Sequence, residues 1–281
     1  MNPFRTKVNK HANPFWLAGS TLLRTIAAGV VAISLAATYA EAAAAEPVKN
    51  AAEPVKNIVL VHGAFADGSS WAKVVTILQA KGYYVTAVQI PLSGFADDVA
   101  ATNRALARQS GPVILVGHSW GGVVITEAGV DQKVVGLVYV AAFGPDAGEV
   151  VGELGKPYPP PPALASPLVD PQGFMTLPTD AVVKHFASDL PPAEARVVAA
   201  TQGPIHVSAF ASKVSNVAWK TKPSWYVVSK LDGAIAPDLE RFFAKRMKAT
   251  TTELNTSHVA MLSKPNDVAA VIMDAASKAP H

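Results

Sequence analysis

A serine stands between glycines in the stretch VILVGHSWGGVVI, residues 113–125, where an apolar run gives way to a helix-like pattern. A serine on a strand–turn–helix junction is held in a strained conformation with its hydroxyl pointing outward. Gly117 and Gly121 are small because such a turn brings strand and helix close together. N–H groups at the start of the helix can stabilise developing negative charge. The pattern therefore predicts that Ser119 is a nucleophile.

A serine hydroxyl needs a base beside it, normally a histidine that an acid orients. His258, in NTSHVAMLSKP, follows the last expected strand and precedes the last expected helix. The other six histidines lie in an expected leader, at the carboxyl terminus, in two glycine turns or in an insertion: His11, His62, His118, His185, His206 and His281. Position therefore favours His258 as the base.

The acid should follow the preceding strand, in the segment YVVSKLDGAIAPDLE. Asp232 comes directly after this strand, and Asp238 lies six residues further on. Asp238 follows Pro237 at the expected start of a helix, where an acid has a structural reason to occur. Asp232 faces the loop and is the predicted acid, with Asp238 as the alternative. The order Ser, Asp, His is typical of one fold.

The stretch VHGAFADGSSW follows the first expected strand and can complete the site. Backbone N–H groups after His62 and Gly63 can pair with that of Trp120 to hold an oxyanion. The donors belong to the backbone, so Ala64 matters by its position. The alternative is an ordinary loop between a strand and a helix.

Apolar runs rich in β-branched residues alternate with amphipathic stretches along most of the chain. The expected strands are 58–62, 83–90, 112–117, 134–141, 224–229 and a weaker one at 250–255. The expected helices include SSWAKVVTILQAKG, FADDVAATNRALARQSG, GGVVITEAGV and PNDVAAVIMDAASKA. This alternation predicts an α/β fold with a mostly parallel, doubly wound sheet of about six strands.

The alternation stops at residues 145–222, where KPYPPPPALASPLVDPQG leads into short helical segments. An insertion at the carboxyl edge of a parallel sheet covers the place where ligands bind, so we expect a helical, proline-rich lid. The lid residues Phe174, Met175, Phe186 and Phe210 suggest an apolar pocket wall. Aromatic residues at such spacings also build the core of a lid, which is the alternative.

The first 42 residues resemble a secretory signal. They hold four basic side chains against one acidic, an apolar run, and Ala40-Glu41-Ala42 as a cleavage site. The run is shorter than the roughly 20 residues that span a bilayer, and an uncleaved anchor is the alternative. We expect a periplasmic or secreted protein, cleaved near Ala42 and without stable membrane insertion. A solvated tether at 43–57 with tandem AAEPVKN should lead into a folded domain at 58–281.

Composition limits the partners. The chain has 24 basic and 21 acidic residues, and the part after residue 42 has 20 of each, which gives no attraction for nucleic acid. There is no cysteine, so disulfides, thiolate metal sites and a cysteine nucleophile are excluded. No metal-ligand spacing, phosphate loop or dinucleotide fingerprint occurs, so neither a metal nor another cofactor is expected.

Residues 58–278 resemble the α/β-hydrolase fold family, through VHGAFADGSSW, GHSWGG, the Asp232 loop and SHVAMLSKP. They are most similar to a bacterial esterase-like branch related to plant methyl esterases and hydroxynitrile lyases. The resemblance implies a catalytic triad of Ser119, Asp232 and His258, with oxyanion donors at Ala64 and Trp120. It implies a serine hydrolase that cleaves a carboxylic ester through an acyl-enzyme, and the lid residues named above suggest an apolar small-molecule ester as its substrate.

Two positions depart from the lyases that this chain resembles. Those enzymes place a threonine and a lysine where this chain has Gly63 and Val259. The hydroxyl and the cation that would handle cyanide are absent, which favours ester hydrolysis. A ligand-binding protein with slow or no turnover, and a cofactor-free perhydrolase or lyase, are the alternatives.

Overall fold

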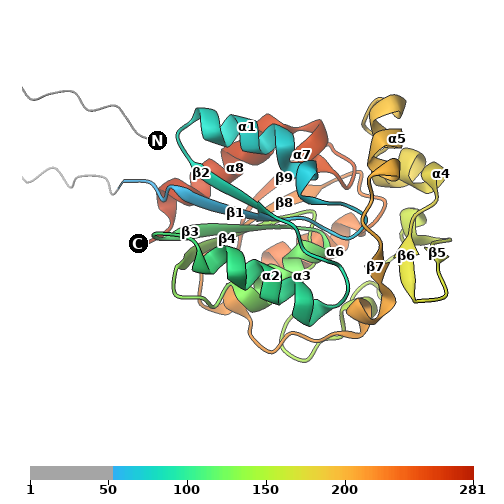
Figure 1. Cartoon of the computed structure of the whole chain (residues 1–281), viewed down its shortest axis with the longest axis horizontal. Helices are drawn as coiled ribbons and strands as arrows, with labels where there is room; N and C mark the ends of the chain where they lie inside the picture. Colours follow the sequence, from blue (N-terminus) through green and yellow to red (C-terminus); the bar gives the residue numbers. More distant parts are fainter. Residues whose placement is uncertain (1–52) are drawn as a thin grey trace, which may run out of the picture. The chain divides into compact units, whose positions relative to one another are not determined.

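Six strands form a central sheet in the order β2-β1-β3-β4-β8-β9, and every neighbouring pair is parallel (Figure 1). The computed structural model describes residues 53–281. The strands are β1 (Asn57–Val61), β2 (Tyr84–Val88), β3 (Val113–His118), β4 (Val134–Val140), β8 (Ser224–Ser229) and β9 (Thr250–Leu254). The strands β1, β3 and β8 are buried along their whole length, which is why they read as continuous apolar runs. The predicted doubly wound α/β fold is confirmed.

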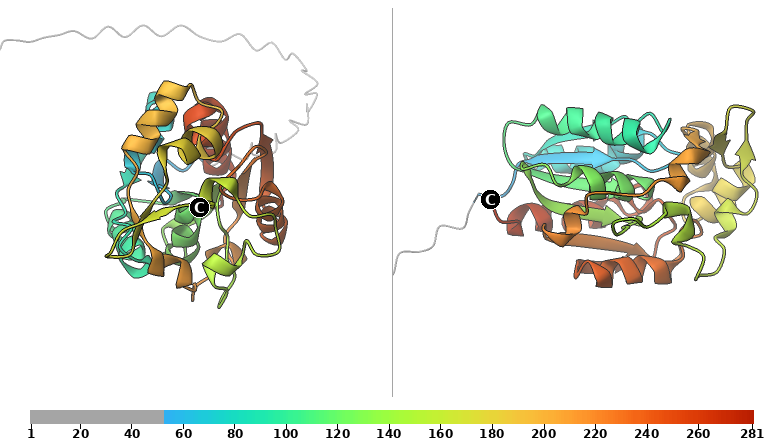
Figure 2. Two further views of the ribbon diagram at one scale, coloured as in Figure 1. Left: turned by 90° about the vertical axis from the view of Figure 1, so that its right-hand side faces the viewer. Right: turned by 90° about the horizontal axis from the view of Figure 1, so that it is seen from below.

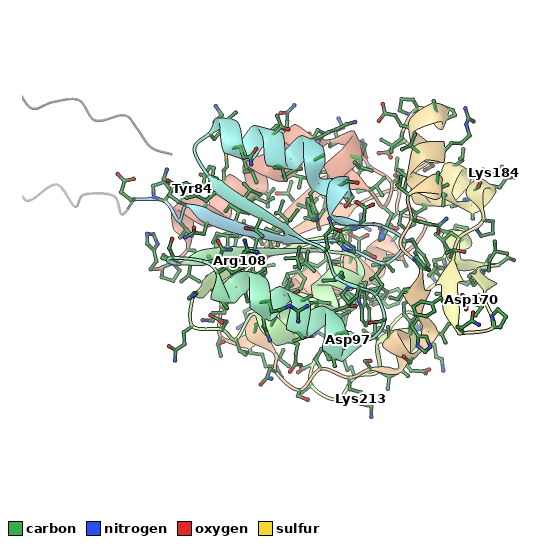
Figure 3. All side chains as sticks on the ribbon, viewed as in Figure 1. Tyr84, Asp97, Arg108, Asp170, Lys184 and Lys213 are labelled. Atoms are coloured by element: carbon green, nitrogen blue, oxygen red, sulfur yellow. The ribbon has the colours of Figure 1, made fainter. Side chains whose placement is uncertain are left out.

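Helices cover both faces of this sheet (Figure 1). One face carries α1 (Ala72–Ala80), the short α7 (Ala260–Ser263) and α8 (Pro265–Lys278), and the other carries α2 (Phe95–Ala107), α3 (Trp120–Ala128) and α6 (Pro237–Arg246). Both α6 and α8 begin with proline and have acidic residues in the first turn and basic ones in the last. These placements suit the free N–H groups and the dipole of a helix. At the sheet edge, the Tyr84 side chain of β2 is exposed (Figure 3).

The insertion between β4 and β8 lies beyond the carboxyl ends of the strands (Figures 1 and 2). It contains α4 (Thr179–Ala181), a π-helical turn (Val182–Phe186), α5 (Pro192–Ala200) and four 3₁₀ turns: Val151–Glu153, Pro162–Leu164, Val207–Ala211 and Ala218–Lys220. It also contains an antiparallel sheet of β5 (Leu168–Val169), β6 (Phe174–Thr176) and β7 (Ile205–His206), which the sequence did not predict. Strands of two or three residues are too short to show an alternating pattern. The lid is therefore mixed in structure and not only helical.

The amino-terminal boundary of the packed domain lies slightly earlier than predicted. Val55 is buried, and its N–H donates to the Ala276 carbonyl at 2.8 Å. Asn57 is the first residue of β1. Residues 55–57 therefore belong to the folded domain and not to the predicted tether. The reason is that Val55, a valine of the tandem AAEPVKN repeat, is buried next to α8. The predicted leader at 1–42 and the tether up to residue 52 lie outside the described residues.

No helix within residues 53–281 combines the length and the apolar character that crossing a bilayer requires.

Candidate active site

Ser119 occupies a sharp turn between β3 and α3, with φ at 52°. This conformation is strained for a residue other than glycine. The turn is tight: a Cβ on Gly117 would lie 2.5 Å from the Gly121 carbonyl oxygen, and one on Gly121 would lie 2.6 Å from that of Val61. Glycine is thus required on both sides of Ser119 by close packing of the backbone, as the sequence predicted.

His258 and Asp232 form a buried pair at the same edge of the sheet. The His258 Nδ1 atom lies 2.5 Å from Asp232 Oδ2. The other oxygen, Oδ1, accepts hydrogen bonds from the N–H groups of Ala234 and Ile235 at 2.6 and 2.9 Å. Because a carboxylate only accepts, it holds the proton of the imidazole on Nδ1 and leaves Nε2 with its lone pair.

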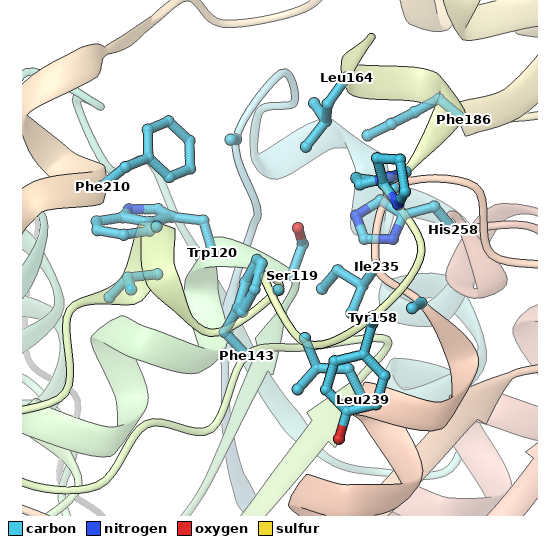
Figure 4. A pocket seen from close by; sticks show the side chains of 18 of the residues that line it. Ser119, Trp120, Phe143, Tyr158, Leu164, Phe186, Phe210, Ile235, Leu239 and His258 are labelled. Atoms are coloured by element: carbon cyan, nitrogen blue, oxygen red, sulfur yellow. The ribbon is translucent and has the colours of Figure 1, made fainter.

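The structure brings Ser119, Asp232 and His258 to one end of the molecule without joining all three by hydrogen bonds. Ser119 and His258 line one cavity (Figure 4). Within residues 53–281, His258 Nε2 is buried and has no hydrogen-bond partner, so it is available to a group in this cavity. The alternative acid, Asp238, is exposed and pairs with Arg241 at 2.8 Å. The geometry pairs His258 with Asp232 and not with Asp238.

The predicted oxyanion donors belong to Ala64, in the loop after β1, and to Trp120, the residue that follows Ser119. Ala64 and Trp120 both line the cavity. Neither backbone N–H donates a hydrogen bond to another group in the part of the chain that the structure describes. Phe65, directly after Ala64, has a φ of 58°, which bends this loop sharply after β1. Two N–H groups without a protein acceptor, in the cavity that Ser119 lines, could hold a developing oxyanion.

His62 and His118, the two histidines in the glycine turns, are neutral and form hydrogen bonds with backbone groups of the surrounding loops. His62 Nε2 accepts from the Ile90 N–H at 3.1 Å, so its Nδ1 donates to the Gly63 carbonyl at 2.9 Å. His118 Nε2 lies 2.9 Å from the His258 carbonyl, to which it donates. Burial lowers the pKa of both rings, and that of His118 well below its usual range. Their places are structural, which agrees with the choice of His258 as the base.

The cavity has a volume of about 560 Å³ and a mainly apolar lining. Of the four lid residues predicted as its wall, Met175, Phe186 and Phe210 line it. Phe174 does not, because its ring packs edge-on against His206 at 5.1 Å. Other lining residues with large side chains were not predicted from the sequence, among them Phe65, Phe143, Tyr158, Leu164, Ile235 and Leu239. Their spacing in the chain gives no signal, because they come from separate loops and one helix.

Comparison with known proteins identifies the family to which this fold belongs. The model of the "Alpha/beta hydrolase family" matches residues 58–271. The chain belongs to the α/β hydrolase family. An α/β hydrolase of Aspergillus novofumigatus is 27% identical, over 79% of this chain and 97% of its own length. Putative methylesterase 19 of Arabidopsis thaliana is 26% identical, over 78% of this chain and 97% of its own length. The crystal structure of a pyrethroid hydrolase from Sphingobium faniae JZ-2 has the same fold, with a TM-score of 0.69. The two sequences are 24% identical, and the match covers 80% of this chain and 98% of that one.

This α/β hydrolase has a buried acid in contact with the Trp120 side chain that the sequence did not indicate. Asp98 of α2 has no exposed surface and accepts from Trp120 Nε1 and from the Leu92 N–H, both at 2.7 Å. The Leu92 carbonyl in turn accepts from the His206 N–H of the lid strand β7 at 2.8 Å. Asp98 therefore links the Trp120 side chain to the loop before α2, and this loop is hydrogen-bonded to the lid strand β7. Burial raises the pKa of Asp98 to about 6.

Replacing Asp98 with asparagine should change how stability depends on pH. An acid whose folded pKa exceeds its unfolded pKa stabilises the protein at low pH, and this contribution is lost as pH rises from about 4 to about 6. The destabilisation caused by Asp98→Asn should thus be larger near pH 4 than near pH 7, by about 2 kcal/mol. Urea unfolding of both proteins at the two pH values measures the difference.

The matched control is Asp97→Asn, which removes the neighbouring, exposed carboxylate on the outer side of α2 (Figure 3). Its effect on the free energy of unfolding should be small at both pH values and should depend on pH much less than that of Asp98→Asn, because Asp97 is only a minor cause of the raised pKa of Asp98. An equal cost of Asp98→Asn at pH 4 and pH 7 would contradict the raised pKa.

Proposed function

We propose that this protein is a serine carboxylesterase that works through an acyl-enzyme. The observation that carries the proposal is the His258 ring, which Asp232 holds at Nδ1 while Nε2 is buried and free beside the cavity that contains Ser119. A base in this state can accept the proton of a serine hydroxyl. The relative named a methylesterase and the family membership support ester hydrolysis as the reaction.

In the first half-reaction, the Ser119 Oγ atom attacks the carbonyl carbon of the ester while His258 Nε2 takes the hydroxyl proton. The carbonyl oxygen becomes an oxyanion and accepts hydrogen bonds from the N–H groups of Ala64 and Trp120. Asp232 stabilises the imidazolium that forms. The ester C–O bond then breaks, His258 gives its proton to the departing alcohol, and the acyl group remains on Ser119.

In the second half-reaction, a water molecule takes the place of the alcohol. His258 removes a proton from this water, and the resulting hydroxide attacks the acyl carbon. The tetrahedral intermediate collapses, Ser119 recovers its proton from His258, and the carboxylic acid leaves. The same two N–H groups stabilise the oxyanion in both half-reactions.

The cavity also suits a ligand-binding protein with slow turnover, which is the second candidate. Pre-steady-state kinetics separates the two. With a 4-nitrophenyl ester, we expect a burst of nitrophenol of about one equivalent per site, followed by a slower steady rate. Burst amplitude is measured by stopped-flow absorbance. Tight binding of the ester without release of nitrophenol would contradict the esterase and favour the binding protein.

Lyase chemistry has less support from the geometry. A Cβ on Gly63 would lie 2.7 Å from the Ser119 Cβ, so a threonine does not fit at this position without movement of the turn. Val259, at the second position, is buried and brings no charge.

The cavity lining favours a small, apolar ester as the substrate. Figure 4 shows Trp120, Phe143 and Phe210 on one side of the Ser119 hydroxyl, and Leu164, Phe186 and His258 on the other. His258 must reach the oxygen of the leaving alcohol, so the alcohol lies on the side of Phe186, whose ring centroid is 4.7 Å from that of His258. The acyl group then lies against Trp120 and Phe210, whose ring centroids are 5.8 Å apart.

Phe210→Ala should therefore change acyl selectivity. Loss of the ring opens the acyl side, so the kcat/KM ratio of bulky to short acyl esters should rise roughly tenfold. The ratios within a series of alcohols should change by less than about twofold. Phe174→Ala is the control, because this lid phenylalanine lies outside the cavity lining. Equal shifts in both series, or a shift with Phe174→Ala, would contradict the assignment of the two sides.

A further inference from the structure

The side chain of Glu240 is buried and has Asp232 as a neighbour. Glu240 belongs to the first half of α6 and has no exposed surface. Its Oε2 atom accepts from the Ser229 N–H at 3.0 Å. Its Oε1 atom is also buried and has no hydrogen-bond partner within residues 53–281, and Asp232 is a neighbouring carboxyl group. No step of the proposed mechanism uses this second acid.

Two carboxyl groups can share a hydrogen bond only when one of them carries a proton. Asp232 has three donors around it, namely the N–H groups of Ala234 and Ile235 and the Nδ1–H of His258. Glu240 has one, the Ser229 N–H, and within residues 53–281 its Oε1 atom accepts no hydrogen bond. Donors stabilise the anion, so the proton belongs on Glu240.

The charged and titratable groups around Glu240 agree with this assignment. Tyr226 of β8 faces it, and burial raises the pKa of this phenol well above its usual range, so Tyr226 stays neutral. Arg241 is the nearest cation, but its guanidinium is paired at the surface with Asp238 and Glu253. Burial, and the neighbouring Asp232, raise the pKa of Glu240 well above that of an ordinary glutamic acid.

We propose that Glu240 is a neutral carboxylic acid whose Oε1–H donates a hydrogen bond to Asp232 and thereby positions the acid of the active site. The inference rests on the proposed function, because it assigns Glu240 a part in the Ser119, His258 and Asp232 mechanism. Glu240 is a positioning residue and touches neither the substrate nor His258 Nε2. A line of hydrogen bonds runs from the Ser229 N–H through Glu240 and Asp232 to His258. It leaves one negative charge behind the imidazole and not two.

The isosteric variant Glu240→Gln tests the charge. A glutamine donates to Asp232 through its NH₂ and accepts from Ser229 through its oxygen, as a protonated glutamic acid does. We expect kcat/KM within about threefold of wild type and the same midpoint for the acid limb of its pH profile. If Glu240 were ionised, this change would remove a negative charge near His258, and the acid limb would move down by about one pH unit. That result would overturn the proposal.

Glu240→Leu tests the hydrogen bond, because leucine cannot donate to Asp232. With one donor fewer, Asp232 is a stronger base and holds the imidazolium more tightly, so the acid limb should move to higher pH and kcat should fall roughly tenfold. Asp238→Asn, on the same helix, removes an exposed carboxylate and should leave the acid limb in place. An unchanged acid limb in a folded Glu240→Leu protein would overturn the proposal.

Infrared difference spectroscopy tests the protonation state without using activity. The wild-type protein minus Glu240→Gln should show the C=O stretch of a protonated carboxyl group, and this band should persist at pH 8. Absence of the band while Ser119-dependent hydrolysis continues would refute the Glu240 assignment alone. A band in a protein that hydrolyses no ester would instead leave the protonation state intact and refute the proposed function.

Discussion

Replacing Ser119 with alanine should lower kcat for ester hydrolysis by a factor on the order of 10⁶, because alanine has no atom that can form the acyl bond. The fold should persist. The Ser119 N–H donates to the Val140 carbonyl, and the Ser119 carbonyl accepts from the N–H groups of Gly122 and Phe143. These bonds involve the backbone alone, so the turn does not depend on the hydroxyl. Steady-state kinetics and thermal unfolding of the same preparation measure both effects.

His258→Ala should lower kcat about as much, and the double variant Ser119→Ala/His258→Ala should lose no more than either single variant. A nucleophile and its base act as one unit, so their losses do not add. Additive losses in the double variant, or full esterase activity in Ser119→Ala, would contradict the proposed mechanism.

The central sheet could be predicted from the sequence because three of its six strands, β1, β3 and β8, are buried along their whole length. Burial over five or more residues requires a continuous apolar run, and β1 and β3 show it clearly. The edge strand β9 is half exposed and polar, so its pattern is weak. The lid sheet escaped prediction because β5 and β7 have two residues each, and register there is set by contacts across the lid.

In the candidate site, too, residues marked by the local sequence could be predicted, and residues placed only by long-range packing could not. Ser119, Asp232 and His258 each follow a recognisable strand, and parallel strands end at one edge, so chain order alone brings them together. Asp98 and Glu240 give no such signal. Each is an acid near the start of a helix, where the helix dipole is a sufficient reason for its presence. Only the packing shows that Asp98 accepts a hydrogen bond from the Trp120 indole and that Glu240 is buried and accepts one from the Ser229 N–H.

Asp232→Asn should lower kcat by roughly 10⁴, less than the loss of the nucleophile or of the base. Both oxygens of Asp232 are acceptors, one from His258 Nδ1 and the other from the N–H groups of Ala234 and Ile235. An asparagine has one acceptor oxygen, so its NH₂ must face one of these donors. If the NH₂ faces Nδ1, the imidazole carries its proton on Nε2 and cannot accept that of Ser119. If the NH₂ faces the loop, two N–H groups lose their acceptor and the loop moves.

The matched control is Asp238→Asn, six residues further along the same segment. The Asp238 side chain is 78% exposed and pairs only with the surface residue Arg241 among its described neighbours, so kcat should stay within about twofold of wild type. The contrast between the two variants assigns the acid, because both remove one carboxylate from the same part of the chain. A severe loss with Asp238→Asn, together with a mild one with Asp232→Asn, would show that the buried pair seen here is structural. In that case Asp238 would have to approach His258 during turnover, which requires α6 to move and its ion pair with Arg241 to break.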